Sequence, residues 1–149
     1  MPRGKYITLE GGEGAGKSTQ AKRLAAFLKK KGIKTVLTRE VGGAPGAEKI
    51  RKIWLEEGEG YWDKTAELML VFAARREHLV KTVWPALKKG CWVVSDRFMD
   101  STRAYQGLPD LTYPFHDNTV HVTLCVRICL HRKKINLSTV FAGQAVGLK

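Results

Sequence analysis

Residues 11–18 read GGEGAGKS and fit the pattern G-x-x-x-x-G-K-[ST], which is typical of a loop that holds phosphate groups. Residues 5–10 (KYITLE) before this loop are rich in strand-forming side chains, and an apolar stripe at helical spacing follows it from Ala21 to Leu28. Glycines let backbone N–H groups converge on an oxyanion, and the start of a helix adds partial positive charge. The stretch therefore predicts a strand, a phosphate-binding loop and a helix, in that order.

Two side chains of this loop have the chemistry to act on a bound nucleoside triphosphate. We expect Lys17 to reach the β- and γ-phosphates and the Ser18 hydroxyl to ligate Mg²⁺. The residues expected to hold the triphosphate cofactor are Gly11, Gly12, Glu13, Gly14, Ala15, Gly16, Lys17, Ser18 and Thr19. Such a loop indicates a nucleotide and a metal ion, but it does not identify the reaction.

Beyond the loop, the chain alternates between strand-like and helix-like segments. A strand is expected at 35–39 (TVLTR), a glycine-rich loop at 41–46, and helices at 47–57 and 65–89, the second interrupted by Pro85. Residues 91–95 (CWVVS) form an almost wholly apolar run of the kind found in strands buried on both faces. This alternation predicts an α/β fold, with a parallel, doubly wound sheet that carries helices on both faces.

Asp96 and Arg97 come directly after the apolar run of residues 91–95. Ligands of open parallel sheets bind at the carboxyl ends of the strands, so both side chains are expected at the reaction site. A carboxylate there can hold a metal ion, and a guanidinium can hold a phosphate with paired donors. We therefore expect Lys17, Asp96 and Arg97 to be the catalytic residues, with Ser18 and Asp96 at the metal.

The composition narrows the class of protein. A chain of 149 residues with 44% hydrophobic and 27% charged residues suits one globular domain with a buried core. Its apolar runs stop well short of the ~20 residues that span a bilayer, and its three cysteines form no CxxC pair, so we expect a cytoplasmic protein with free thiols. The net charge of +12 favours an anionic partner. Nucleic acid, a membrane surface and a small phosphorylated substrate all fit this charge, and charge alone does not choose among them, but no RNP, zinc-finger or repeat signature favours nucleic acid.

Five motifs carry a resemblance to a known family. They are LEGGEGAGKSTQ (9–20), TREVGG (38–43), LVFAARR (70–76), SDRF (95–98) and DSTRAYQG (100–107). In this order and spacing the chain resembles the thymidylate kinases, which are P-loop nucleoside-monophosphate kinases, over about residues 5–107. The resemblance implies ATP-dependent phosphorylation of dTMP to dTDP, with Mg²⁺ as cofactor and a homodimer as the usual assembly.

The resemblance also implies roles for side chains on the acceptor side. It places Glu13 on the deoxyribose 3′-hydroxyl, Phe72 in a stack with thymine, and Arg76 in a hydrogen bond with the base. It further implies Arg39 and Glu40 near the acceptor phosphate, Arg97 on that phosphate, and Thr102, Tyr105 and Gln106 around the nucleoside. Without the resemblance, Phe72 is interpreted as a core aromatic of an amphipathic helix. Two positions depart from the family pattern: Val41 replaces a proline, and Arg75 stands where an acidic or amide residue is common.

After Gly107 the sequence changes character. The family continues with an arginine-bearing lid and further strands and helices, and no lid is recognisable here. We therefore divide the chain into a kinase core at 1–107 and an atypical segment at 108–149, and expect an incomplete C-terminal part with one plausible strand at 121–130.

The unrecognised lid bears on the expected activity. An arginine on the γ-phosphate is worth ~10³–10⁵ in rate in P-loop enzymes, so we expect turnover far below the ~1–100 s⁻¹ typical of kinases. A catalytically silent nucleotide-binding fragment and a P-loop kinase for another small acceptor stay open as alternatives. A basic nucleic-acid-binding protein rests on the net charge alone.

Overall fold

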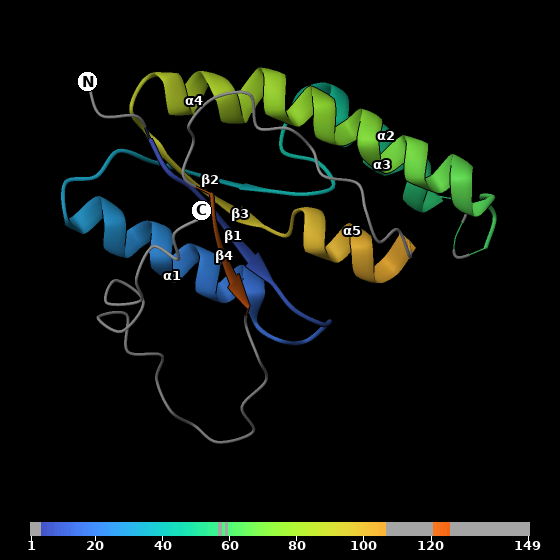
Figure 1. The fold of residues 1–149 in the computed structure, drawn as a ribbon, viewed down its shortest axis with the longest axis horizontal. Helices are drawn as coiled ribbons and strands as arrows, with labels where there is room; N and C mark the ends of the chain where they lie inside the picture. The colour runs from blue at the N-terminus through green and yellow to red at the C-terminus, as the bar shows by residue number, and fades with distance from the viewer. Residues whose placement is uncertain (1–3, 57, 59, 107–120, 126–149) are drawn as a thin grey trace, which may run out of the picture.

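A computed structural model describes residues 4–56, 58, 60–106 and 121–125 (Figure 1). In chain order its elements are β1 (Tyr6–Glu10), α1 (Lys17–Lys30), β2 (Thr35–Arg39), α2 (Pro45–Glu56), α3 (Lys64–His78), η1 (Leu79–Val83), α4 (Trp84–Lys88), β3 (Trp92–Asp96), α5 (Met99–Gln106) and β4 (His121–Cys125). The predicted alternation of strands and helices is confirmed. Helix α2 begins at Pro45, inside the range predicted as a loop, because proline is favourable in the first turn of a helix.

The four described strands form one parallel sheet in the order β2-β3-β1-β4. Strand β1 therefore lies between β3 and β4, and all five of its residues are buried. In register, Leu9 of β1 and Arg39 of β2 both lie opposite Asp96 of β3. The carboxyl ends of three neighbouring strands thus meet at one edge of the sheet, which brings Glu10, Arg39 and Asp96 to the same end of the molecule.

Helices cover both faces of the sheet, as predicted (Figure 1). Helix α1 packs on one face, where its apolar stripe contacts Ile7 and Leu9 of β1. On the opposite face, η1 and α4 pack against Tyr6 of β1 and Val93 of β3. Neighbouring residues of a strand point to opposite faces, so the two cores share one sheet.

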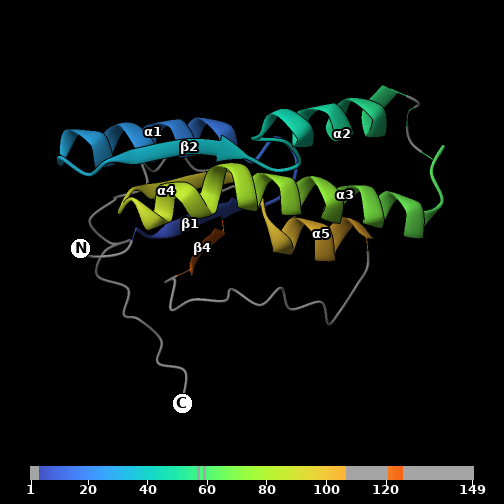
Figure 2. The ribbon, with the colours of Figure 1, turned by 90° about the horizontal axis from the view of Figure 1, so that it is seen from above.

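The helical segment predicted at 65–89 is a run of three helices, α3, η1 and α4, that follow one another along one line (Figure 2). Asp63 caps its first turn, because its carboxylate accepts hydrogen bonds from the N–H groups of Thr65 (2.9 Å) and Ala66 (3.2 Å). The π-helical turn η1 comes directly before α4, which holds Pro85 in its first turn. Since proline lacks an N–H and crowds the carbonyl four residues earlier, the wider turn accommodates it within a continuous run.

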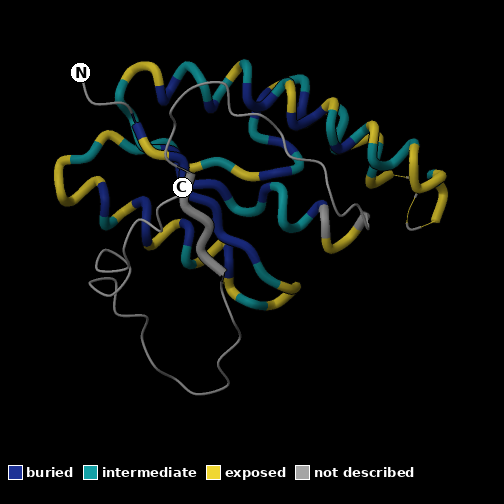
Figure 3. The backbone as a smooth tube through the Cα atoms, in the orientation of Figure 1, coloured by how far each residue is buried: buried dark blue, intermediate teal, exposed yellow. Residues whose placement is uncertain are grey.

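Strand β4 pairs with β1 in parallel register from His121 to Cys125. It is the described part of the strand predicted at 121–130, and residues 126–130 lie outside the described residues. Apart from β4, so does the predicted atypical segment 108–149. In the described part of the chain, no helix has the length and apolar character to cross a membrane. Figure 3 shows buried residues along β1, in the middle of β3 and on the inward sides of the helices, whereas the edge strand β2 has only intermediate and exposed residues.

Candidate active site

The glycine-rich loop joins β1 to α1, as its position in the sequence predicts. Gly14 and Gly16 have φ values of 71° and 79°, a region that side chains other than glycine's rarely adopt, and Gly16 directly precedes the first helical residue. Lys17 is 7% exposed, and its Nζ donates to the Gly12 carbonyl at 2.5 Å. The lysine ammonium therefore lies over the loop, at the N-terminus of α1, where phosphate oxygens are best held.

The metal-ligating pair expected from the sequence is in direct contact. The Ser18 hydroxyl donates a hydrogen bond to Oδ2 of Asp96, across from the start of α1 to the end of β3. The other oxygen of Asp96, Oδ1, is buried and has no hydrogen-bond partner among the described residues. A hydroxyl and a carboxylate are the oxygen ligands that Mg²⁺ accepts alongside substrate phosphates and water, so this pair fits the ion. No group of three or more His, Cys, Asp or Glu side chains suited to a metal occurs among the described residues.

Arg97 turns back toward the loop from the end of β3. Among the described residues it is the single non-glycine residue with a positive φ, 73°, and its N–H donates to the Leu9 carbonyl at 3.0 Å. Its Nη1 lies 3.1 Å from the Ser101 hydroxyl and 3.4 Å from the Gly11 carbonyl, and its guanidinium lies 5.2 Å from the centre of the Tyr105 ring. The strained backbone thus directs a cation to the space between the loop and α5.

Glu10 is a site residue that the sequence analysis missed. It ends β1 and is 3% exposed, and its Oε2 accepts from the Ser101 hydroxyl at 2.5 Å and the Ser101 N–H at 3.1 Å. Burial raises the pKa of this carboxyl, and the Ser101 hydrogen bond opposes the rise. The signal in the sequence is a carboxylate at the last position of a buried strand, directly before the glycines.

Three arginines gather at the same end of the sheet. The Arg39 guanidinium donates to Glu48 at 2.9 Å, which lowers the pKa of that carboxyl, and Arg51 donates to the Val41 carbonyl at 2.8 Å. Burial, Arg39 and Arg97 all lower the pKa of Arg51, so these three cations lie within electrostatic reach of one another. The sequence analysis missed Arg51.

A cavity of about 550 Å³ opens beside this cluster. Its lining includes Ser18, Lys22, Arg39, Glu48, Thr82 and Asp96. Because it is lined by both proposed metal ligands and by cationic side chains, the cavity suits a phosphorylated, metal-bound ligand.

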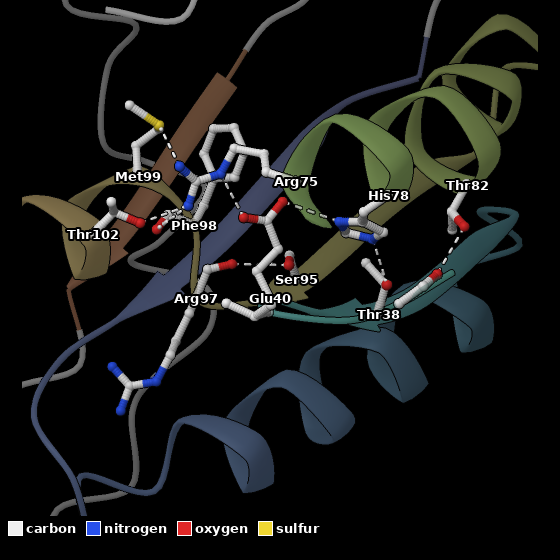
Figure 4. Close-up of polar contacts among 12 residues, drawn as sticks. Thr38, Glu40, Arg75, His78, Thr82, Ser95, Arg97, Phe98, Met99 and Thr102 are labelled. Atoms are coloured by element: carbon white, nitrogen blue, oxygen red, sulfur yellow. Dashed lines mark hydrogen bonds and ion pairs between the residues drawn. The ribbon is translucent and has the colours of Figure 1, made fainter. Parts of the chain in front are cut away.

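Two neighbouring arginines of α3 point to different places. Arg75 is 2% exposed, and its Nη2 donates to the Thr102 hydroxyl at 2.7 Å, so it faces α5 (Figure 4). Arg76 is exposed, and its guanidinium lies 4.9 Å from the centre of the Trp84 ring. The half-buried Phe72 ring lies 5.2 Å from the Arg75 guanidinium. The structure therefore brings Arg75 to α5, whereas Arg76 lies against Trp84, and nothing in the sequence distinguishes these two adjacent arginines.

The other residues implied by the resemblance are spread over the same region. Glu40 is buried at 6% exposure and is bonded to Arg75, whereas Glu13 is exposed on the loop. Thr102 is 5% exposed and Tyr105 is 55% exposed, both on α5. The side chain of Gln106 lies outside what the structure describes.

A parallel sheet whose inner strand runs into a glycine-rich loop, with a lysine over that loop and a serine bonded to the aspartate of the next strand, defines a P-loop nucleotide-binding protein of the kinase type. The family described as Thymidylate kinase matches residues 9–124. The chain belongs to the thymidylate kinase family. This match passes residue 107 and includes part of β4, which the motifs did not reach.

Individual relatives agree with the family. The chain is 56% identical over 110 residues to a thymidylate kinase of Rhizorhabdus wittichii, which covers 74% of this chain and 52% of the relative. For a thymidylate kinase of Alkalilimnicola ehrlichii the identity is 53% over 107 residues, covering 72% and 49%. The crystal structure of thymidylate kinase from Ehrlichia chaffeensis is similar with a TM-score of 0.66 and 42% identity, over 71% of this chain and 60% of that one. The chain spans about half the length of the curated relatives it matches.

Proposed function

We propose that this chain transfers the γ-phosphoryl group of ATP to dTMP and forms dTDP. The observation that carries the proposal is the contact between Ser18 and Asp96, because it joins the triphosphate loop to the strand end that bears Arg97. Donor and acceptor phosphates would meet at this junction, as transfer between them requires. The relatives named above are thymidylate kinases, which supports this choice of acceptor.

On the donor side, Lys17 would hold the β- and γ-phosphates against the N-terminus of α1. Ser18 and Asp96 would hold Mg²⁺, which would supply positive charge against the phosphate oxygens during transfer. On the acceptor side, Arg97, Arg39 and Arg51 would hold the phosphate of dTMP. Arg51 and Arg97 hydrogen-bond to the backbone carbonyls of Val41 and Gly11, and guanidinium groups gathered in this way favour a phosphate between them.

For the nucleoside we propose an aromatic and an arginine from α3, together with residues of α5. Phe72 would stack on thymine, and the contact with Thr102 favours Arg75 as the arginine that bonds the base. Arg76, which the resemblance implies, is the alternative. The remaining proposed contacts are Glu13 with the 3′-hydroxyl, Glu40 near the acceptor phosphate, and Tyr105 and Gln106 beside the sugar.

The test measures ADP formation with Mg²⁺ and ATP, and with dTMP, dUMP, dCMP, AMP or no acceptor. We expect ADP formation above the acceptor-free rate with dTMP foremost, and its loss in Lys17→Ala, which removes the ammonium from the phosphates. Equal rates with every acceptor would contradict the proposal. Binding of ATP and dTMP without ADP formation would indicate the second candidate, a nucleotide-binding fragment. This candidate is favoured by the fact that the chain spans about half the length of its relatives.

The proposed assembly is a cytoplasmic homodimer formed through α2 and α3. These helices pack side by side, and large apolar side chains on them face solvent: Ile53 is 48%, Leu55 52% and Met69 67% exposed. Exposed apolar groups on adjacent helices favour burial against a second copy of the same surface.

A further inference from the structure

A buried histidine of α3 has no role in the proposed reaction. His78 is 0% exposed, and both of its ring nitrogens have partners from elsewhere in the chain (Figure 4). Nδ1 lies 3.0 Å from Oε1 of Glu40, and Nε2 lies 2.7 Å from the Thr38 hydroxyl. These contacts are satisfied together when Nδ1–H donates to Glu40 and Nε2 accepts from Thr38. The ring is therefore held in one orientation between β2 and the residue that follows it.

Glu40 is shared between His78 and Arg75. Its Oε2 accepts from Nε of Arg75 at 2.7 Å, and both side chains of this ion pair are almost fully buried. A buried carboxylate needs a donor on each oxygen, because an unpaired buried charge is costly. Without the His78 donor, Oε1 of Glu40 would lose this hydrogen bond, and the Glu40 side chain would be free to rotate away from Arg75.

The guanidinium group of Arg75 contacts α5. Its Nη2 donates to the Thr102 hydroxyl at 2.7 Å and to the Phe98 carbonyl at 3.2 Å, and its Nη1 lies 3.0 Å from the Met99 sulfur. The hydrogen bonds thus form one unbroken series from β2, through two side chains of α3, to α5.

The loop that follows β2 packs closely against the His78 ring. A Cβ on Gly43 would come within 2.6 Å of the His78 ring and 2.4 Å of the Thr38 hydroxyl, so only glycine fits there. One turn further along, the Thr82 hydroxyl donates to the Gly43 carbonyl at 2.7 Å. Thr82 therefore anchors the same loop from η1.

We propose that His78 is a positioning residue for the acceptor nucleotide. By holding Glu40, it fixes the Arg75 guanidinium against Thr102 and thereby sets the affinity for the nucleoside part of dTMP, although it touches no nucleotide itself. This inference rests on the proposed function. The effect is assigned to one ring atom, Nδ1. The experiment therefore removes the Nδ1 contact with Glu40 and the Nε2 contact with Thr38 separately.

The test compares two amide variants of similar size. In His78→Asn the side-chain amide falls near the position of Nδ1 and can still donate to Glu40, whereas in His78→Gln it falls near Nε2 and retains only the Thr38 contact. Calorimetric titration of the full chain with dTMP should show dTMP affinity about tenfold weaker in His78→Gln and near wild type in His78→Asn, because one hydrogen bond to a charged group is at stake. ATP affinity should stay within about twofold in both, since the phosphate loop is untouched. Thr35→Val, which removes a hydroxyl that donates to the Ile33 carbonyl at the start of β2 and lies outside this series, should bind dTMP as the wild type does.

A second readout needs no nucleotide. The Nε–H signal of Arg75 in proton–nitrogen NMR reports its bond to Glu40, and it should shift and exchange faster in His78→Gln but not in His78→Asn or Thr35→Val. Equal dTMP affinity in the two amide variants, or an Arg75 signal unchanged in His78→Gln, would overturn the inference. If the wild-type chain binds ATP and not dTMP, the proposed acceptor is wrong, and the Arg75 signal still decides whether His78 holds Glu40.

Discussion

Ser101 connects the two charged groups that flank the phosphate loop. Its hydroxyl donates to Glu10 and accepts from Arg97, so it holds the proposed acceptor-phosphate cation in place. We expect Ser101→Ala to weaken dTMP binding about three- to tenfold and to leave thymidine binding unchanged, because thymidine lacks the phosphate. Titration calorimetry with both ligands measures this, and Ser101→Thr, which retains the hydroxyl, is the control. A loss that is equal for dTMP and thymidine would contradict the role assigned to Ser101.

Glu10 makes stability depend on pH in a defined direction. Burial raises the pKa of its carboxyl in the folded chain above that in the unfolded chain. Below the unfolded value of about 4.3 the group is protonated in both states, and as pH rises through the folded pKa its ionisation costs more in the folded state. We therefore expect Glu10→Gln to gain stability relative to wild type as pH rises from about 4 to 8. Urea unfolding across this range tests it, and a difference independent of pH would refute it.

Site residues that belong to short motifs could be predicted from the sequence. Residues whose partners lie far away in the sequence were predicted less well. The structure brings the predicted site residues Lys17, Ser18, Asp96 and Arg97 together, because strand ends and the glycine loop fix where they lie. Arg75 was missed because a four-residue spacing cannot tell which of two adjacent arginines turns inward. The partner that decides this, Thr102 on α5, is distant in the sequence. Glu10 and Arg51 were missed for the same reason.

Helix α3 carries Arg75 and His78, so its start matters to the site as well as to stability. Asp63 satisfies two N–H groups that a helix of this length leaves without intrahelical partners. We expect Asp63→Ala to lower the free energy of unfolding by about 1 kcal/mol, with an unchanged denaturant slope. Asp63→Ser, which keeps a capping oxygen, should lose much less. Equal losses in the two variants would show that the cap contributes little.

Strands and helices were predictable where local patterns determine them. Strand β2 was predicted at its observed residues because alternation and flanking glycines mark both of its ends. The π-helical turn η1 was not predicted, because Pro85 signals an interruption without indicating how the backbone absorbs it.

At the scale of the whole molecule, the proposed dimer makes a direct prediction. Met69→Glu places a carboxylate on the exposed apolar surface of α3, and we expect it to shift the protein from dimer to monomer in sedimentation velocity. Ala104→Glu adds the same charge on exposed α5 and should leave the dimer intact. A wild-type chain that sediments as a monomer at all concentrations would exclude this assembly.

The family's extent was the least predictable feature. The motifs end at residue 107, whereas the family match continues to residue 124 and includes part of β4. The strand itself was predicted within 121–130, but it carries no motif residue, and its place beside β1 depends on pairing between distant parts of the sequence.

The strand order has a consequence for synthesis on the ribosome. β1 is made first, but its neighbour β3 begins only at Trp92, after α1, β2 and the long helical run have left the exit tunnel. Until then the nascent chain has a complete phosphate loop with no strand beside it and no Asp96 opposite Ser18. At ~5–20 residues per second of translation, that interval lasts several seconds. The exposed apolar faces of the strands can bind chaperones during this time. ATP could therefore bind a fully formed pocket only late in the synthesis of the chain.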